Sequence, residues 1–197
     1  MIKNKIMTQE IYLIRHTTPL VEKGICYGNT DLQLAEKFED ELKEIKSILP
    51  DFTDIPTYSS PLFRCHHLAK HLQNNHSLIT LKDELKEMNF GDWEMKKWTE
   101  IDEETLNEWM KNFIEKQTPN GESYEIVKNR VNHFWNQIIE KNDEKIAIVT
   151  HFGVIQSILC ILFEMPPAKA FRFELDYGAV IRIKKTGKEH YKIKFLR

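Results

Sequence analysis

Two short apolar runs along the chain predict buried strands, and a histidine follows directly after each of them. Residues 10–14 form the first run, which leads into Arg15 and His16. Residues 145–150 form the second run, which leads into His151. Ligands of open α/β sheets bind just outside the carboxyl ends of the strands. We therefore expect the two histidines to meet in space although they lie far apart in sequence.

Between and after these runs, apolar residues recur at helical spacing. The spacing predicts five helices, over residues 32–49, 62–72, 99–116, 122–140 and 153–163. Asp31 is the expected N-cap of the first helix, and Pro50 ends it. Ser60-Pro61 suits the start of the second helix, which carries Arg64 in its first turn. The pattern therefore places an arginine at a helix start close to a strand end.

Shorter apolar or alternating segments predict the remaining strands. They cover residues 55–59, 78–81, 170–176, 179–183 and 191–195. Strands that alternate with helices favour an α/β fold, here a three-layer α/β/α sandwich with a mostly parallel central sheet and antiparallel edge strands near the C-terminus. A chain of 197 residues can bury one substantial core, so residues 1–197 are expected to form a single domain.

Composition narrows the classes of function. The net charge is -2, so nothing global attracts nucleic acid or an anionic membrane. No apolar stretch approaches the roughly 20 residues that span a bilayer, and residues 1–7 do not resemble a signal peptide. The three cysteines, Cys26, Cys65 and Cys160, are odd in number and widely spaced, which favours a reducing cytoplasm. We expect a cytoplasmic protein with no nucleic-acid or membrane partner, as a monomer or homodimer.

Four motifs carry the candidate chemistry, at residues 13–17, 59–64, 84–94 and 149–153. Each motif alone has an ordinary structural explanation. In this order, however, they resemble the histidine phosphatase (phosphoglycerate-mutase-like) superfamily, over residues 11–173. The likeness is closest to the alpha-ribazole-5'-phosphate phosphatases of cobalamin nucleotide-loop assembly, because residues 84–95 and the helix entry at 120–122 match that group. The resemblance implies a phosphoglycerate-mutase-like fold.

The residue types suit hydrolysis of a phosphomonoester, which needs a nucleophile, a cationic cage and a proton for the leaving alcohol. His16 would attack phosphorus and form a phosphohistidine. Arg15 and Arg64 offer forked donors to phosphate oxygens, and His151, protonated beside bound phosphate, completes the cage. Glu87 would protonate the leaving oxygen and then activate water. These cations neutralise the phosphate, so no metal and no cofactor is expected.

The loop after the first motif is expected to supply further substrate contacts, from Thr17, Tyr27 and Gly28. It also departs from the family pattern, since Thr17 replaces a common glycine and Glu22 stands near the place of a common asparagine. Residues 176–179 differ from the family's small polar turn as well. These departures weaken the substrate assignment more than the mechanism.

Residues 88–120 lie where this family often carries a lid over the site, and they are rich in aromatics. These rings could stack on an aromatic base of the substrate, or they could form the small core of the lid itself, which is the favoured interpretation. His67 and His71 have a zinc-like spacing but no cysteine or carboxylate partner.

The leading hypothesis is a phosphomonoesterase that acts on alpha-ribazole 5'-phosphate, a small molecule. A broad-specificity small-molecule phosphatase is the alternative, and the leaving alcohol stays open. A phosphoglycerate mutase is disfavoured because the residues after Glu87 lack the arginine of that group. A non-catalytic phosphate-binding domain would be expected to have lost His16, Glu87 or His151, and all three are present.

Overall fold

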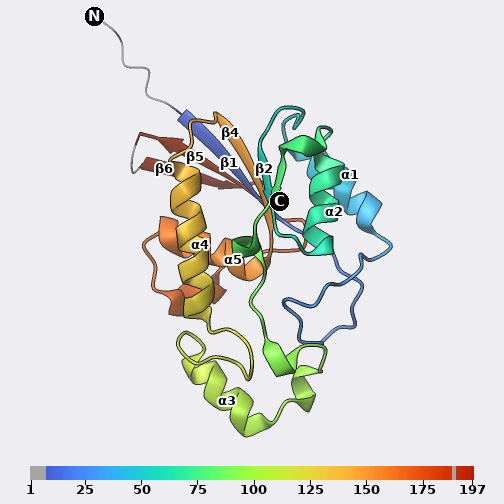
Figure 1. Cartoon of the computed structure of the whole chain (residues 1–197), viewed down its shortest axis with the longest axis vertical. Coiled ribbons are helices and arrows are strands. Elements are labelled where there is room, and N and C mark those ends of the chain that lie inside the picture. Colours follow the sequence, from blue (N-terminus) through green and yellow to red (C-terminus); the bar gives the residue numbers. More distant parts are fainter. Residues whose placement is uncertain (1–7, 188–189) are drawn as a thin grey trace, which may run out of the picture.

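A computed structural model describes residues 8–187 and 190–197 of the chain. The prediction about a signal peptide at residues 1–7 lies outside these described residues. Within them the strands form one six-stranded sheet of order β3-β2-β4-β1-β5-β6 (Figure 1). The strands are β1 (Thr8–Arg15), β2 (Thr57–Ser59), β3 (Ile79–Leu81), β4 (Lys145–Thr150), β5 (Val180–Thr186) and β6 (His190–Phe195). The first four in sheet order pair in parallel, and β5 and β6 pair antiparallel.

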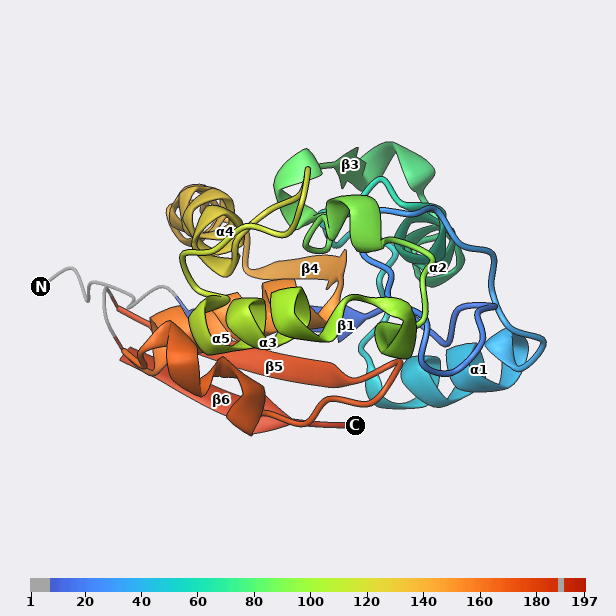
Figure 2. The same ribbon diagram turned by 90° about the horizontal axis from the view of Figure 1, so that it is seen from below.

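Helices cover both faces of this sheet. They are α1 (Phe38–Ile48), α2 (Phe63–Leu72), α3 (Glu103–Asn112), α4 (Tyr124–Ile139) and α5 (Phe152–Leu162). In Figure 1, α1 and α2 lie on one side of the strands and α4 and α5 on the other. Figure 1 shows α3 below these layers, and in Figure 2, which is seen from below, it lies in front of them. The mostly parallel α/β/α sandwich that the sequence predicts is confirmed. Among the described residues, no helix is both long and apolar enough to cross a membrane.

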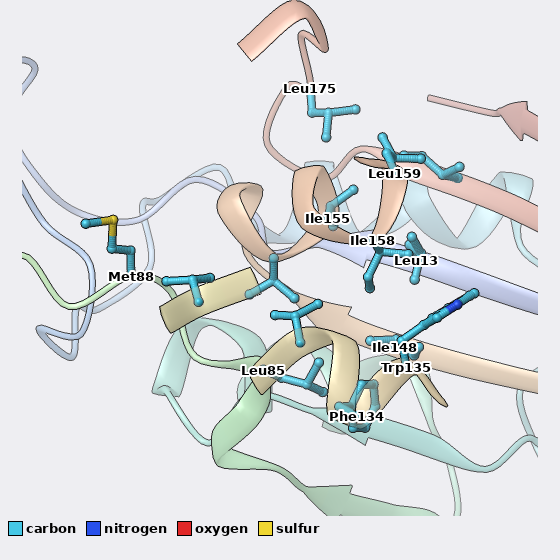
Figure 3. Close-up of a cluster of buried hydrophobic side chains, with 14 of the residues drawn as sticks. Leu13, Leu85, Met88, Phe134, Trp135, Ile148, Ile155, Ile158, Leu159 and Leu175 are labelled. Atoms are coloured by element: carbon cyan, nitrogen blue, oxygen red, sulfur yellow. The ribbon is translucent and has the colours of Figure 1, made fainter. Parts of the chain in front are cut away.

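The alternation of side chains along β1 explains why its apolar run is continuous. Ile11 and Leu13 belong to the core cluster beneath α4 and α5, whereas Tyr12 and Ile14 belong to the cluster beneath α1 and α2. Successive strand residues point to opposite faces, so a strand covered on both sides is apolar throughout. Figure 3 shows Leu13 among the side chains of the α4–α5 cluster.

The first helix begins later than predicted, at Phe38 and not at Leu32. The backbone before it is engaged elsewhere, because the N–H of Ala35 donates to the carbonyl of Thr18 and Leu34 forms an isolated bridge with Pro19. Asp31 is not the N-cap of α1. Its carboxylate instead accepts the N–H of Phe63, the first residue of α2, at 2.6 Å. The helical spacing of residues 32–37 therefore serves tertiary packing and not a helix.

Two further boundaries differ from the sequence predictions. The strand expected at residues 170–176 is absent from the described structure, because residues 167–172 form a short 3-10 helix that buries Ala170. The helix expected over 99–116 is shorter, since Asp102 caps α3 by accepting the N–H of Thr105 at 2.9 Å. Other 3-10 turns lie at residues 76–78, 83–85, 91–93 and 98–100.

Candidate active site

The pairing of β1 with β4 brings the two predicted histidines together. Arg15 lies opposite Thr150 in the parallel ladder, so His16 and His151 follow from neighbouring strand ends. The N–H of His16 donates to the carbonyl of Thr150 at 3.0 Å. The two imidazole centroids are 5.1 Å apart. This is the carboxyl edge of the parallel strands, where ligands of open α/β sheets bind.

The ring of His16 is held with one nitrogen ready to react. Its Nδ1 lies 2.7 Å from the carbonyl oxygen of Thr17, and a carbonyl only accepts, so Nδ1 carries the proton and Nε2 keeps its lone pair. Burial, followed by the charges of Arg64 and Arg15, holds the pKa of His16 well below its ordinary value. An unprotonated, oriented imidazole is the form that a nucleophile requires.

Two guanidinium groups flank this ring. Arg64 is fully buried and donates to the carbonyls of Thr30 at 2.8 Å and Gly28 at 2.5 Å. Arg15 donates to the carbonyl of Leu175, and its guanidinium lies 4.1 Å from the centroid of the Tyr177 ring. In the described part of the chain neither arginine has a carboxylate partner, and the Nε of each has no partner.

This arrangement favours an anion. An arginine keeps its charge in proteins, and a buried charge without a counter-ion is costly. A negatively charged ligand beside His16 would supply the missing counter-charge.

His151 lies deep in the same site. Its Nε2 is 2.8 Å from Ser60 Oγ and 3.3 Å from Cys65 Sγ. Burial, followed by the charge of Arg64, lowers the pKa of His151 well below its ordinary value. In the free site this ring is therefore neutral. The expectation that it is protonated concerns the phosphate-bound state and stays a prediction.

Glu87 reaches the site from the segment after β3. Its Oε1 accepts the N–H of Met88 at 3.0 Å, and its Oε2 accepts the N–H of Gly153 at 3.1 Å, in the first turn of α5. A Cβ at position 153 would lie 2.5 Å from Oε1, so the glycine is what allows this approach. Glu87 and His16 line the same pocket, which puts a carboxyl group in the same space as the His16 imidazole.

That pocket has a volume of about 210 Å³. Its polar wall includes Arg15, His16 and Glu87, and its remaining wall is mostly aromatic. Tyr27 also lines it, whereas Arg64, His151, Thr17 and Gly28 are not among its lining residues.

Comparison with known proteins identifies the family of the chain. Residues 11–196 match the histidine phosphatase superfamily, branch 1. The chain belongs to this superfamily. It is 26% identical over 174 residues to the adenosylcobalamin/alpha-ribazole phosphatase of Escherichia coli K12, which covers 85% of this chain and 86% of that protein.

Solved structures of other phosphatases share the fold. The alpha-ribazole phosphatase from Shigella flexneri superposes with a TM-score of 0.86 at 25% identity, covering 95% of this chain and 96% of the other. A phosphoserine phosphatase from Entamoeba histolytica superposes with a TM-score of 0.80 at 22% identity, with the same coverage of 95% and 96%. The second likeness shows the fold alone.

Three polar residues that support the site were not predicted from the sequence. Arg130 is the first. From α4 it donates to the backbone carbonyls of Glu84, Lys86 and Glu87 at 2.7–3.0 Å. Its remaining N–H groups bind both carboxylate oxygens of Glu122 at 3.0 Å. All five donors of the guanidinium are used. Arg130 therefore fixes the segment that presents Glu87.

Glu94 is the second. Its carboxylate accepts the backbone N–H groups of residues 28, 29 and 30 at 2.8–3.1 Å, the hydroxyl of Thr30, and the N–H of Phe90. These hydrogen bonds lower the pKa of Glu94 against the opposing effect of its burial. The same loop offers the carbonyls that hold Arg64. A Cβ at Gly28 would lie 1.8 Å from the carbonyl oxygen of Met88, so only glycine fits here.

Tyr177 is the third. Its hydroxyl lies 2.5 Å from that of Tyr27, and its ring centroid lies 5.6 Å from that of His16. The pair joins the loop after β1 to the turn before β5. Thr17, next to the nucleophile, is fully buried, and its hydroxyl has no partner among the described residues.

His67 and His71 make packing contacts with aromatic rings. Their rings lie 4.3 Å apart, and both contact Phe38. Among the described residues, no group of three or more histidine, cysteine, aspartate or glutamate side chains is placed to hold a metal ion.

Proposed function

We propose that this protein is a phosphomonoesterase that works through a phosphohistidine on His16. The observation that carries the proposal is the pairing of a neutral, oriented His16 with two guanidinium groups that lack a counter-ion. Arg15 and Arg64 bind the phosphoryl oxygens, and their charges offset the repulsion that an anionic ester presents to a nucleophile. His151 contributes a further donor once phosphate is bound.

The reaction follows from this arrangement in two steps. The lone pair of His16 Nε2 forms a bond to phosphorus while the bond to the leaving oxygen breaks, and Glu87 gives that oxygen its proton. Water then attacks the phosphohistidine and loses a proton to Glu87, and the N–P bond breaks to release phosphate. Thr17, Tyr27 and Gly28 are proposed to shape the phosphate site, and residues 88–120 to act as its lid within one domain.

Alpha-ribazole 5'-phosphate is the proposed substrate, in the cytoplasm, because relatives that match most of the chain are named for it. A broad-specificity small-molecule phosphatase is the second candidate. The departures from the family pattern at Thr17 and Glu22 favour it. Hydrolysis rates for alpha-ribazole 5'-phosphate, 3-phosphoglycerate, and nucleoside and sugar monophosphates separate the two, since a broad enzyme cleaves several at similar kcat/KM.

The mechanism is tested by trapping the intermediate. Rapid quench with ³²P-labelled substrate, without acid, should yield an acid-labile and base-stable phosphoenzyme, and His16→Ala should yield none. Activity should persist in EDTA and be inhibited by vanadate. Wild-type turnover in His16→Ala, or activity that returns only when a divalent ion is added, would contradict the mechanism.

A further inference from the structure

Two groups of side chains line the pocket that holds His16. Arg15, His16 and Glu87 form the polar group. Five aromatic rings joined by ring contacts form the other group, which we call the aromatic wall: Phe90, Trp98, Trp109, Phe113 and Phe171. A phosphomonoester with its phosphorus at His16 must place its leaving group in the remainder of this pocket. The wall therefore faces the leaving group and not the phosphate.

The rings of the predicted lid have separate tasks. Trp93 is 4% exposed, belongs to the buried core cluster and is not among the lining residues of the pocket. Phe90, Trp98 and Phe113 are only partly buried against that cluster, and all three line the pocket. Trp109 connects the two groups, because it packs on Trp93 at 5.4 Å and also lines the pocket. The lid thus has its own core and still presents rings to a ligand.

Phe171 belongs to the wall but comes from a different segment of the chain than the other four rings. It lies in the 3-10 helix at residues 167–172, is 58% exposed and contacts the ring of Phe113 at a centroid distance of 5.2 Å. Phe163 offers a contrast. It is 45% exposed, stacks on Phe173 and does not line the pocket. A large exposed aromatic at the edge of a ligand pocket gains burial when a flat ligand covers it.

The charges of the pocket disfavour a leaving group that carries its own anionic group. Among the described residues that line it, Arg15 is the one lysine or arginine, and it directly precedes His16 in the chain. A leaving group with its own carboxylate, as in phosphoserine or a phosphoglycerate, needs a second cation. The aromatic wall has none to offer.

We propose that the aromatic wall binds a flat aromatic base on the leaving alcohol, so that the enzyme selects nucleoside-type phosphomonoesters over sugar phosphates and phosphorylated acids. The proposal rests on the proposed function, in which the phosphorus lies at His16. Stacking of a base on an aromatic side chain typically changes affinity by roughly 5- to 150-fold. The aromatic wall thereby governs the choice of substrate, and the polar group performs the phosphoryl chemistry.

The test compares two esters that differ only in the base. Alpha-ribazole 5'-phosphate is set against methyl α-ribofuranoside 5-phosphate, in which a methoxy group replaces the base. We expect kcat/KM to favour the first by roughly 5- to 150-fold. Phe171→Ala should lower this ratio by about 5-fold or more. Phe163→Ala, the matched control, should leave it unchanged. Thermal unfolding of each variant reports whether the fold is kept.

A binding measurement distinguishes a failure of the aromatic-wall proposal from a failure of the proposed function. Trp98 and Trp109 lie in the wall, so the nucleoside alpha-ribazole should quench tryptophan fluorescence, and Phe171→Ala should weaken its binding. Equal kcat/KM for the two esters would contradict base binding by the aromatic wall but would not contradict the proposed phosphatase activity. If neither ester is hydrolysed, the proposed function fails. In that case, nucleoside binding would support the aromatic wall as a site for a flat base, and absence of binding would contradict it.

Discussion

Arg64 and His16 share one buried site in which the arginine is charged and the histidine is not. The guanidinium is anchored by two carbonyl oxygens of the loop at residues 28–30, which fixes its plane without cancelling its charge. The same charge, together with burial, keeps protons off His16. In the proposed mechanism, one side chain thus prepares the nucleophile and attracts the ester.

Arg64→Lys tests whether the forked geometry matters in addition to the charge. An ammonium cannot span two carbonyls and the phosphate oxygens together. We expect kcat/KM to fall roughly 100- to 1000-fold, almost as far as in Arg64→Ala. Vanadate inhibition should weaken in parallel, and thermal unfolding should exclude a folding defect. Full activity in the lysine variant would mean that Arg64 only supports the loop.

Glu87→Gln separates proton delivery from binding. An alkyl alcohol leaves poorly without a proton, whereas p-nitrophenolate is stable as an anion, and general acid catalysis contributes about 100- to 10,000-fold. The burst of phosphoenzyme from a ribose 5-phosphate ester should therefore collapse, while the burst from p-nitrophenyl phosphate falls modestly. Equal losses with both substrates would show that Glu87 does not deliver the proton.

At the scale of elements, Glu94 joins the loop after β1 to the predicted lid. Its two oxygens accept five hydrogen bonds, four from backbone N–H groups and one from a hydroxyl. The loop holds Arg64 in turn. In the proposed function, phosphate binding and the position of the predicted lid are therefore connected through one carboxylate.

Glu94→Gln should break this connection. An amide NH₂ in place of either oxygen would face N–H donors and leave them unsatisfied, at a cost of about 1–3 kcal/mol in the free energy of unfolding. We also expect a raised inhibition constant for vanadate, because Arg64 loses its fixed carbonyls. Urea unfolding and inhibition assays measure the two effects. Glu104→Gln, an exposed residue of α3, is the control, and an equally small effect of both changes would contradict the role of Glu94.

Much of the fold could be predicted because the burial of β1 and β4 on both faces makes their sequences continuously apolar. The start of α1 could not, because residues 32–37 have the apolar spacing of a helix while their backbone pairs with residues 18–19. Among the site residues, side chains at strand ends were accessible to sequence analysis.

The supporting residues were not accessible in this way. Glu94, Arg130 and Tyr177 bind groups that lie 66, 46 and 150 residues away along the chain. The partners of Glu94 and Arg130 are largely backbone groups, which any residue type can supply. Glu94 and Tyr177 lie in segments that the sequence analysis names, at residues 84–94 and 176–179, but no local pattern indicates the supporting roles of the three residues.

For the whole molecule, the two buried histidines link stability to pH. The pKa values of His16 and His151 lie well below the ordinary value of 6.5, so the unfolded chain binds more protons than the folded one in the range between. Stability from this source is complete above pH 6.5 and is lost as the pH falls below it.

Urea unfolding between about pH 7.5 and 5.5 measures this effect. Each histidine should lower the free energy of unfolding by up to about 1.4 kcal/mol for each unit by which the pH falls below 6.5. His16→Asn should show a shallower slope. His133→Gln, which changes an exposed histidine of α4, should keep the wild-type slope. A pH-independent wild type would contradict the lowered pKa values.

The register of β1 against β4 has a consequence for engineering. The two reactive rings are spaced by ladder hydrogen bonds in the centre of the sheet, so their separation owes nothing to the connecting loops. Residues 95–98 pair with the backbone of Gly24 and Cys26, and Glu94 lies just before them. A chimaera that takes residues 99–117 from a relative keeps these contacts and exchanges Trp109 and Phe113. Such grafts would retarget the enzyme to new esters while the phosphoryl-transfer centre is inherited intact.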